Sequence, residues 1–156
     1  MVELEREKTY LLKELPKDLA GCKVEIIRDA FVPSSAEHPI LRVRQRGHRY
    51  EITKKVPVSG TDFSRQEEHT IRLTQLEFEA LAAGDAKRFA KRRYHCVVDG
   101  RKAEVDIYFE ALEGLAIIDF EFHNDEEMEA FTMPAICLAD ITQEKVFAGG
   151  VLAGKS

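Results

Sequence analysis

KRFAKRRYHCVVDGRKAEVDIY, residues 87–108 of this 156-residue chain, carries the clearest strand and turn pattern in the sequence. Two runs of alternating side chains flank Asp99-Gly100, a dipeptide typical of tight hairpin turns. In both runs charged residues of one sign stand two positions apart, namely Lys91, Arg93, Glu104 and Asp106. Because a β-strand points alternate side chains to opposite faces, each pair lies on one face of its strand. The stretch therefore predicts an antiparallel hairpin with one strongly polar face.

The same two-residue spacing recurs elsewhere in the chain. Three further like-charged pairs are Glu5 and Glu7, Arg42 and Arg44, and Asp119 and Glu121, and Lys55 and Arg65 stand in similar runs. Such pairs indicate a sheet with one polar face and one apolar face. If that sheet closes on itself, its lumen carries clustered cations and clustered carboxylates. That lumen suits a highly anionic ligand that travels with a divalent metal, such as a polyphosphate chain.

Turn signals divide the chain into short elements. Strands are expected over 2–12, 23–31, 40–45, 50–56, 65–73, 87–98, 102–110 and 115–123. Short helical segments are expected over 16–21, 74–84 and 124–131, with a connector over 134–140 and a last helical turn over 142–148. The pattern predicts one domain, residues 1–156, of the α+β class and mainly β, with antiparallel strands in a barrel-like arrangement.

Composition narrows the range of partners. The net charge of -5 argues against nucleic-acid binding, because the basic run at 87–93 is short and stands in an acidic chain. No apolar stretch approaches the roughly 20 residues of a membrane span, so no membrane partner is expected. Isolated cysteines and the absence of a signal-peptide pattern indicate a cytoplasmic protein. A small-molecule ligand is expected, and a homodimer stays open.

The acidic pairs are candidates for binding Mg²⁺ or Mn²⁺, which prefer carboxylate oxygens. The alternative for each pair is a solvated outer face with cross-strand ion pairs. Asp119 follows Leu-Ala-Ile-Ile, a sequence typical of a central strand. Buried carboxylates need a partner or a metal ion. The acidic pairs therefore point to metal binding at this strand in particular.

The basic positions come from four expected strands and are candidates for binding phosphate. Arginine offers a fork that matches phosphate oxygens, and lysine offers a compact charge. Their alternative is ordinary surface charge. The sequence has no Gly-rich phosphate loop, no GxGxxG and no nucleophile elbow. Attack by a metal-activated water is the chemistry that these residue types best support.

Seven short motifs, in order, resemble the CYTH family of triphosphate tunnel metalloenzymes. They are LRVRQRG (41–47), TKK (53–55), SRQE (64–67), KRRY (91–94), AEVDIY (103–108), DFEF (119–122) and DITQEK (140–145). The resemblance covers nearly the whole chain, from about residue 5 to about residue 152. It implies an eight-stranded antiparallel β-barrel that forms a tunnel, with a few short helices.

The resemblance also implies roles for individual residues. Phosphate ligands would be Arg42, Arg44, Lys55, Arg65, Lys91 and Arg93, with Lys145 facing the tunnel from the last helical segment. Metal ligands would be Glu5, Glu7, Asp119 and Glu121, and Glu5 or Glu7 would orient the attacking water. Supporting residues would be Glu67, Glu104 and Asp106. The expected cofactor is Mg²⁺ or Mn²⁺.

The sequence departs from the family pattern at three places. Threonine, Thr9, stands where the E-x-E-x-K signature has lysine, His69 stands where a glutamate often follows Glu67, and Phe147-Ala-Gly149 replaces an aromatic-polar-Asn motif. The expected function is metal-dependent hydrolysis of inorganic triphosphate or of a nucleotide or other organic triphosphate. The alternatives are a non-catalytic polyphosphate or nucleotide binder, an adenylate cyclase of the same family, and a β-rich interaction domain with solvated charges.

Overall fold

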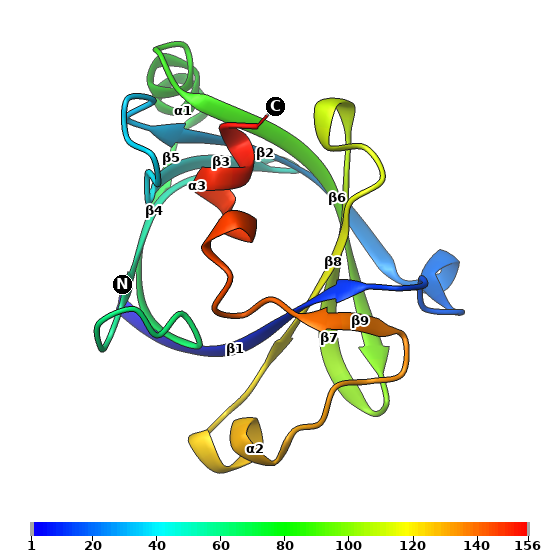
Figure 1. Cartoon of the computed structure of the whole chain (residues 1–156). Helices are drawn as coiled ribbons and strands as arrows, with labels where there is room; N and C mark the ends of the chain where they lie inside the picture. Colours follow the sequence, from blue (N-terminus) through cyan, green and yellow to red (C-terminus); the bar gives the residue numbers. More distant parts are fainter. Residues whose placement is uncertain (1, 156) are drawn as a thin grey trace.

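The structure is a computed structural model that describes residues 2–155. Those residues form one antiparallel sheet in the order β5-β4-β3-β2-β6-β7-β8-β1-β9, and β5 also pairs with β1. Eight strands therefore close into a barrel, as expected, which Figure 1 shows end-on. The strands are β1 (Val2–Leu12), β2 (Lys23–Val32), β3 (Leu41–Arg46), β4 (Arg49–Pro57), β5 (Arg65–Leu73), β6 (Lys87–Val98), β7 (Arg101–Tyr108), β8 (Ala116–Glu121) and β9 (Cys137–Asp140).

Strand β1 closes the barrel because it is shared between two neighbours. Its first half pairs with β5, where Glu5 lies opposite Gln66. Its second half pairs with β8, where Glu7 lies opposite Glu121 and Thr9 lies opposite Asp119. The alternation of side chains along β1 therefore places one row of residues in the lumen and the other row on the outer surface.

The helices begin and end close to where their caps predict. They are η1 (Leu19–Gly21), α1 (Gln75–Ala82), η2 (Glu110–Leu112), α2 (Asp125–Ala130), η3 (Lys145–Phe147) and α3 (Gly149–Ala153). Thr74 and Glu77 form the predicted reciprocal capping box of α1. Asn124 caps α2 by accepting a hydrogen bond from the Glu127 N–H. Within residues 2–155, the helices are all too short or too polar to cross a membrane.

Two expectations for the C-terminal region were wrong. Residues 134–140 were expected as a connector, but β9 lies within them and pairs with the end of β1. The last helical turn was expected to end before Gly149, but α3 begins there. A Cβ on Gly150 would lie 2.0 Å from the Pro39 carbonyl oxygen, so glycine permits a close approach that the local sequence does not reveal.

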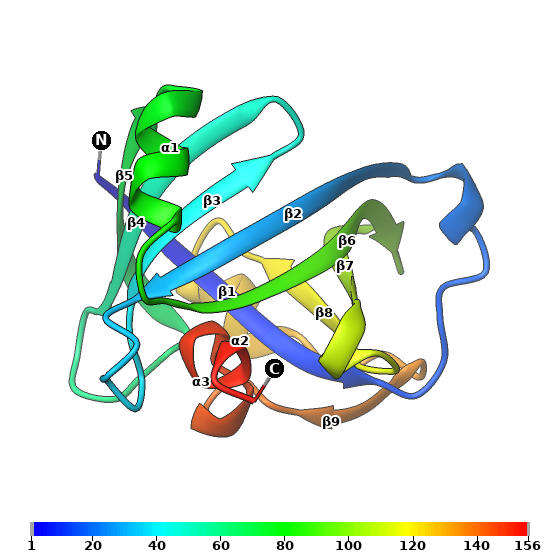
Figure 2. The ribbon, with the colours of Figure 1, turned by 90° about the horizontal axis from the view of Figure 1, so that it is seen from above.

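The C-terminal segment lies at one mouth of the barrel, where α3 lies within the ring in Figure 1 and at one end of the barrel in Figure 2. An apolar cluster packs there, made of Phe31, Phe89, Tyr108, Ile117, Ile141, Leu152 and Ala153. A second apolar cluster lies outside the barrel, where β9 and α2 cover the outer face of β7, β8 and β1. The lumen is therefore apolar at the covered mouth, and its charged residues lie further along.

Candidate active site

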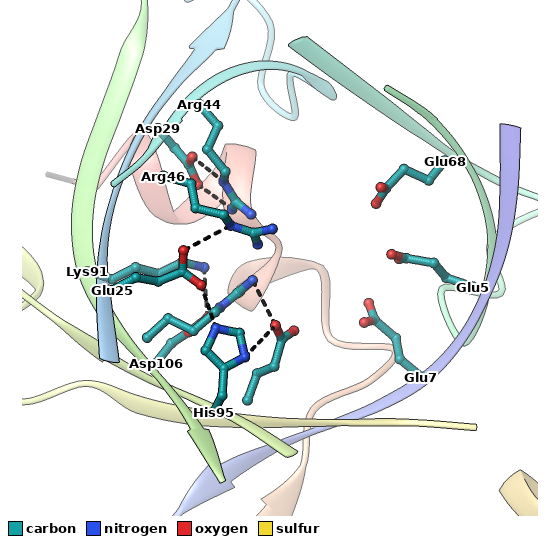
Figure 3. Close-up of polar contacts among 12 residues, drawn as sticks. Glu5, Glu7, Glu25, Asp29, Arg44, Arg46, Glu68, Lys91, His95 and Asp106 are labelled. Atoms are coloured by element: carbon teal, nitrogen blue, oxygen red, sulfur yellow. Dashed lines mark hydrogen bonds and ion pairs between the residues drawn. The ribbon is translucent and has the colours of Figure 1, made fainter. Parts of the chain in front are cut away.

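The barrel encloses a cavity of about 410 Å³ to which all eight closing strands contribute side chains. Most of the cations occupy one arc of its wall, and most of the carboxylates occupy another. The basic wall consists of Arg42, Arg44, Arg46, Lys91 and Arg93, on β3 and β6. The acidic wall consists of Glu5, Glu7, Glu68, Glu104, Asp119 and Glu121, on β1, β5, β7 and β8. Figure 3 shows Glu5, Glu7 and Glu68 across the lumen from Arg44, Arg46 and Lys91.

Two buried aspartates hold the basic wall in place. Asp29 accepts two hydrogen bonds from Arg44, each 2.7 Å long (Figure 3). Asp106 accepts bonds of 2.8 and 2.9 Å from Arg93 and lies 2.7 Å from the Lys91 ammonium. Burial alone raises the pKa of Asp29, but the Arg44 guanidinium outweighs it and lowers that pKa to about 2. The supporting role predicted for Asp106 agrees with this geometry.

The basic wall carries more positive charge than Asp29 and Asp106 neutralise. Burial, and then the neighbouring Arg44, lowers the pKa of Arg42 to about 10. Its Nε is buried and has no hydrogen-bond partner within residues 2–155. Burial likewise lowers the pKa of Lys91 to about 8, despite the attraction of Asp106. Buried donors and charges without full compensation are costly, and an anionic ligand in the lumen would compensate them.

The acidic wall surrounds one lysine. The Lys55 Nζ lies 2.7 Å from an oxygen of Glu5, 3.6 Å from one of Glu68 and 3.9 Å from one of Glu7. Burial raises the pKa values of Glu5 and Glu7 even though Lys55 opposes that effect. The acidic wall therefore has more negative charge than one lysine satisfies, and it can accept further cationic charge.

Thr9 lies where the resemblance leads us to expect lysine. Its hydroxyl donates a 2.5 Å hydrogen bond to the Asp119 carboxylate. This bond satisfies one oxygen of Asp119 but brings no positive charge. Burial, and then the charge of Glu7, raises the pKa of Asp119 to about 7. A carboxyl group that gains a proton near neutral pH therefore lies in the lumen beside Thr9.

The stability of the metal-free protein should fall as the pH rises from about 4 to about 7. The folded chain holds the Asp119 proton more tightly than the unfolded chain, for which the ordinary pKa is 3.8. The unfolded state therefore binds fewer protons in this range, and the stability that protonation gives is lost as the pH rises through about 7. Thermal unfolding in EDTA at several pH values measures the trend.

Asp119→Asn is the matched control for this trend. Its midpoint should depend less on pH than that of the wild type, because the titrating group is gone. Burial lowers the pKa of His38, so His38 makes the stability rise with pH. This contribution is the same in both proteins and cancels in the comparison. Equal pH dependence in the two proteins would contradict a raised pKa at Asp119.

Three predicted ligands lie outside the lumen. Arg65 and Glu67 are on the outer face of β5, since the side chains of Gln66 and Glu68 line the cavity. The expectation that Arg65 and Glu67 face the lumen was therefore wrong. Because side chains alternate along a strand, choosing the other face of β5 places the opposite set of residues inside. Arg65 instead binds Asp125 at 2.9 Å and thereby ties β5 to α2. Lys145 is exposed on η3 and does not line the cavity.

Several charged residues of the barrel interior were not expected from the sequence, although the period-2 spacing of their strands indicates most of them. Arg46 continues the row of Arg42 and Arg44, and His95 continues the row of Lys91 and Arg93. The His95 Nε2 lies 2.5 Å from one carboxylate oxygen of Glu25 (Figure 3). The other oxygen of that carboxylate lies 3.5 Å from the Arg46 Nε. The His95 Nδ1 lies 3.7 Å from Glu104. This group joins the basic wall to the acidic wall.

Known proteins resemble the chain over nearly its full length. An inorganic triphosphatase from Nitrosomonas europaea is 30% identical over 155 residues, which cover 98% of this chain and 97% of that protein. A crystal structure of an inorganic triphosphatase superposes with a TM-score of 0.71 at 23% identity, covering 97% of this chain and 95% of the other. A candidate adenylate cyclase from Bacillus halodurans has a TM-score of 0.60 at 12% identity, covering 92% and 98% of the two chains.

A scan against models of protein families finds no match. The relationship therefore rests on the full-length similarity to the Nitrosomonas protein and on the shared barrel. The motifs that carry the resemblance also fall where a tunnel enzyme needs them, since LRVRQRG, KRRY and DFEF all place charged residues in the lumen. On the strength of that similarity, the chain belongs to the CYTH family of triphosphate tunnel metalloenzymes.

Proposed function

We propose that this protein hydrolyses inorganic triphosphate, or the triphosphate group of an organic compound, inside the barrel. The observation that carries the proposal is the division of one cavity into a basic and an acidic wall. A polyphosphate needs cations along its length, and its hydrolysis needs an activated water. The activity of the Nitrosomonas relative, an inorganic triphosphatase, supports the same conclusion.

The basic wall would bind the phosphate oxygens. Asp29 and Asp106 hold Arg44 and Arg93 by two bonds each, so these guanidinium groups are oriented before the substrate enters. Donors that are already oriented stabilise developing negative charge without reorganising during the reaction. Arg42, with its unpartnered Nε among the described residues, would donate to the substrate directly.

The acidic wall has the donor set that Mg²⁺ and Mn²⁺ prefer, since its carboxylate oxygens face one lumen. In the described part of the chain, no three carboxylates are arranged to hold a metal ion. Lys55 instead lies among Glu5, Glu7 and Glu68. A bound divalent metal would neutralise phosphate charge and acidify a water molecule. Glu7 would orient that water and accept its proton, as the water oxygen bonds to the terminal phosphorus and the bridging P–O bond breaks, which releases phosphate and diphosphate.

Phosphate release from inorganic triphosphate, with Mg²⁺, with Mn²⁺ and with EDTA, tests this proposal. Release that depends on the metal is expected, together with stabilisation against thermal unfolding by triphosphate. Stabilisation without release from inorganic or organic triphosphates would instead favour a binding protein. Diphosphate formed from ATP together with a cyclic nucleotide would favour a cyclase.

Arg42→Met should weaken the binding of inorganic triphosphate in EDTA by about 10- to 100-fold, the range expected when a charge-assisted hydrogen bond is lost. The measurement is isothermal titration calorimetry on the metal-free protein. Arg28→Met is the matched control, because Arg28 is exposed on the neighbouring strand β2 and does not line the cavity. If both variants bound triphosphate like the wild type, the basic wall would not be the binding site.

A further inference from the structure

Lys55 is a cation on the wrong side of the lumen for a phosphate ligand. It lies on β4 between the two walls, yet its ammonium is turned to the acidic wall, 2.7 Å from Glu5. Glu7 and Glu68 lie within 3.9 and 3.6 Å of the same nitrogen. These carboxylates are among the oxygen ligands that the proposed divalent metal would use.

Lys55 and a metal ion would compete for these carboxylates. A metal ion binds an oxygen at about 2.0–2.2 Å, so an ammonium group on the same oxygen would lie against a like charge. The Glu5 oxygen that Lys55 approaches is also buried, and within residues 2–155 it lacks a partner with hydrogen-bond geometry. Lys55 therefore balances the charge of Glu5 without ideal hydrogen-bond geometry, so a ligand with better geometry can compete for that oxygen.

The position of Lys55 on β4 limits where its ammonium group can move. Thr53 lies opposite Arg42 in the β3–β4 register, and Lys55, two residues along the same face, lines the same cavity. A lysine that leaves the acidic wall therefore turns toward Arg42. Without an anion between them, the two cations repel each other. With a triphosphate in the lumen, the released ammonium gains a phosphate partner.

We propose that Lys55 is a built-in counter-ion of the acidic wall that gives way to the metal only when triphosphate is present to receive it. This inference rests on the proposed function. It adds that metal and triphosphate bind cooperatively rather than independently. Such coupling is reciprocal, because each ligand raises the affinity for the other by the same factor.

Titration of the full chain with Mn²⁺, followed by the electron paramagnetic resonance of free Mn²⁺, tests the proposal without turnover. Mn²⁺ alone should bind the wild type weakly, and imidotriphosphate, a non-hydrolysable analogue, should tighten that binding by about 5- to 150-fold, the range of typical coupling between sites. Lys55→Met should bind Mn²⁺ alone about 10-fold more tightly than the wild type and show less coupling. Lys55→Arg should keep the weak binding of the wild type.

Lys54→Met is the matched control, because the Lys54 side chain, next to Lys55 in the sequence, is exposed and does not line the cavity. It should bind Mn²⁺ like the wild type. Equal Mn²⁺ affinity in Lys55→Met and Lys54→Met would overturn the proposal. So would a wild-type affinity for Mn²⁺ that imidotriphosphate leaves unchanged, a measurement that needs no variant to fold. Coupled binding with no phosphate release from any triphosphate would refute the hydrolase alone, and release without coupling would refute the counter-ion role alone.

Discussion

Glu7→Gln is expected to reduce the rate of phosphate release by about 10²–10⁴-fold, the contribution typical of general acid–base catalysis. Glutamine keeps the size of the side chain but neither accepts a proton nor contributes a negative charge to the acidic wall. Glu7 lies opposite Glu121 in the register of β1 and β8, near Lys55, and burial raises its pKa toward the range useful for proton transfer. The measurement is kcat with Mg²⁺ at saturating triphosphate.

The binding of imidotriphosphate in EDTA should change little in Glu7→Gln, since the basic wall is intact. Glu67→Gln is the matched control for the rate, because Glu67 lies on the outer face of β5 and its ion pair is with His69. That control should keep the wild-type kcat. A Glu7→Gln variant as active as Glu67→Gln would remove Glu7 from the proposed mechanism.

Asp106→Asn is expected to destabilise the fold by about 3–5 kcal/mol, the cost typical of leaving buried charges without their partner. Asp106 is 1% exposed and compensates both Lys91 and Arg93, which are also buried. Asparagine fits the same space but carries no charge, so the two cations would repel each other in the lumen. Urea denaturation in EDTA measures the loss through the shift of the midpoint at constant m-value.

Asp125→Asn is the control for this loss. Asp125 also bridges two cations, Arg6 and Arg65, but it is exposed on α2, where water solvates the charges. Its midpoint should stay close to that of the wild type. Triphosphate should stabilise Asp106→Asn more than it stabilises the wild type, because the anion supplies charge that the variant lacks. Equal loss in the two variants would contradict the burial argument.

Much of the fold could be predicted from local pattern. The structure confirms the strand over Arg65–Leu73, the capping box of α1 and the turn at Asp99-Gly100, because each depends on residues close together in the sequence. The like-charged pairs also predicted a polar inner face correctly, since a strand separates its two faces by alternation alone. The chemistry of a cavity with cations and carboxylates followed from those pairs.

The strands, the charged lumen and most of its residues thus follow from local alternation along the chain. The inward face of β5, the pairing of β9 and the position of α3 at one mouth depend instead on how the chain folds as a whole. The tertiary structure also decided that Lys55 faces the acidic wall rather than the arginines. These features depend on strand register and on contacts across the closed barrel, which join residues far apart in the sequence and leave no local signal.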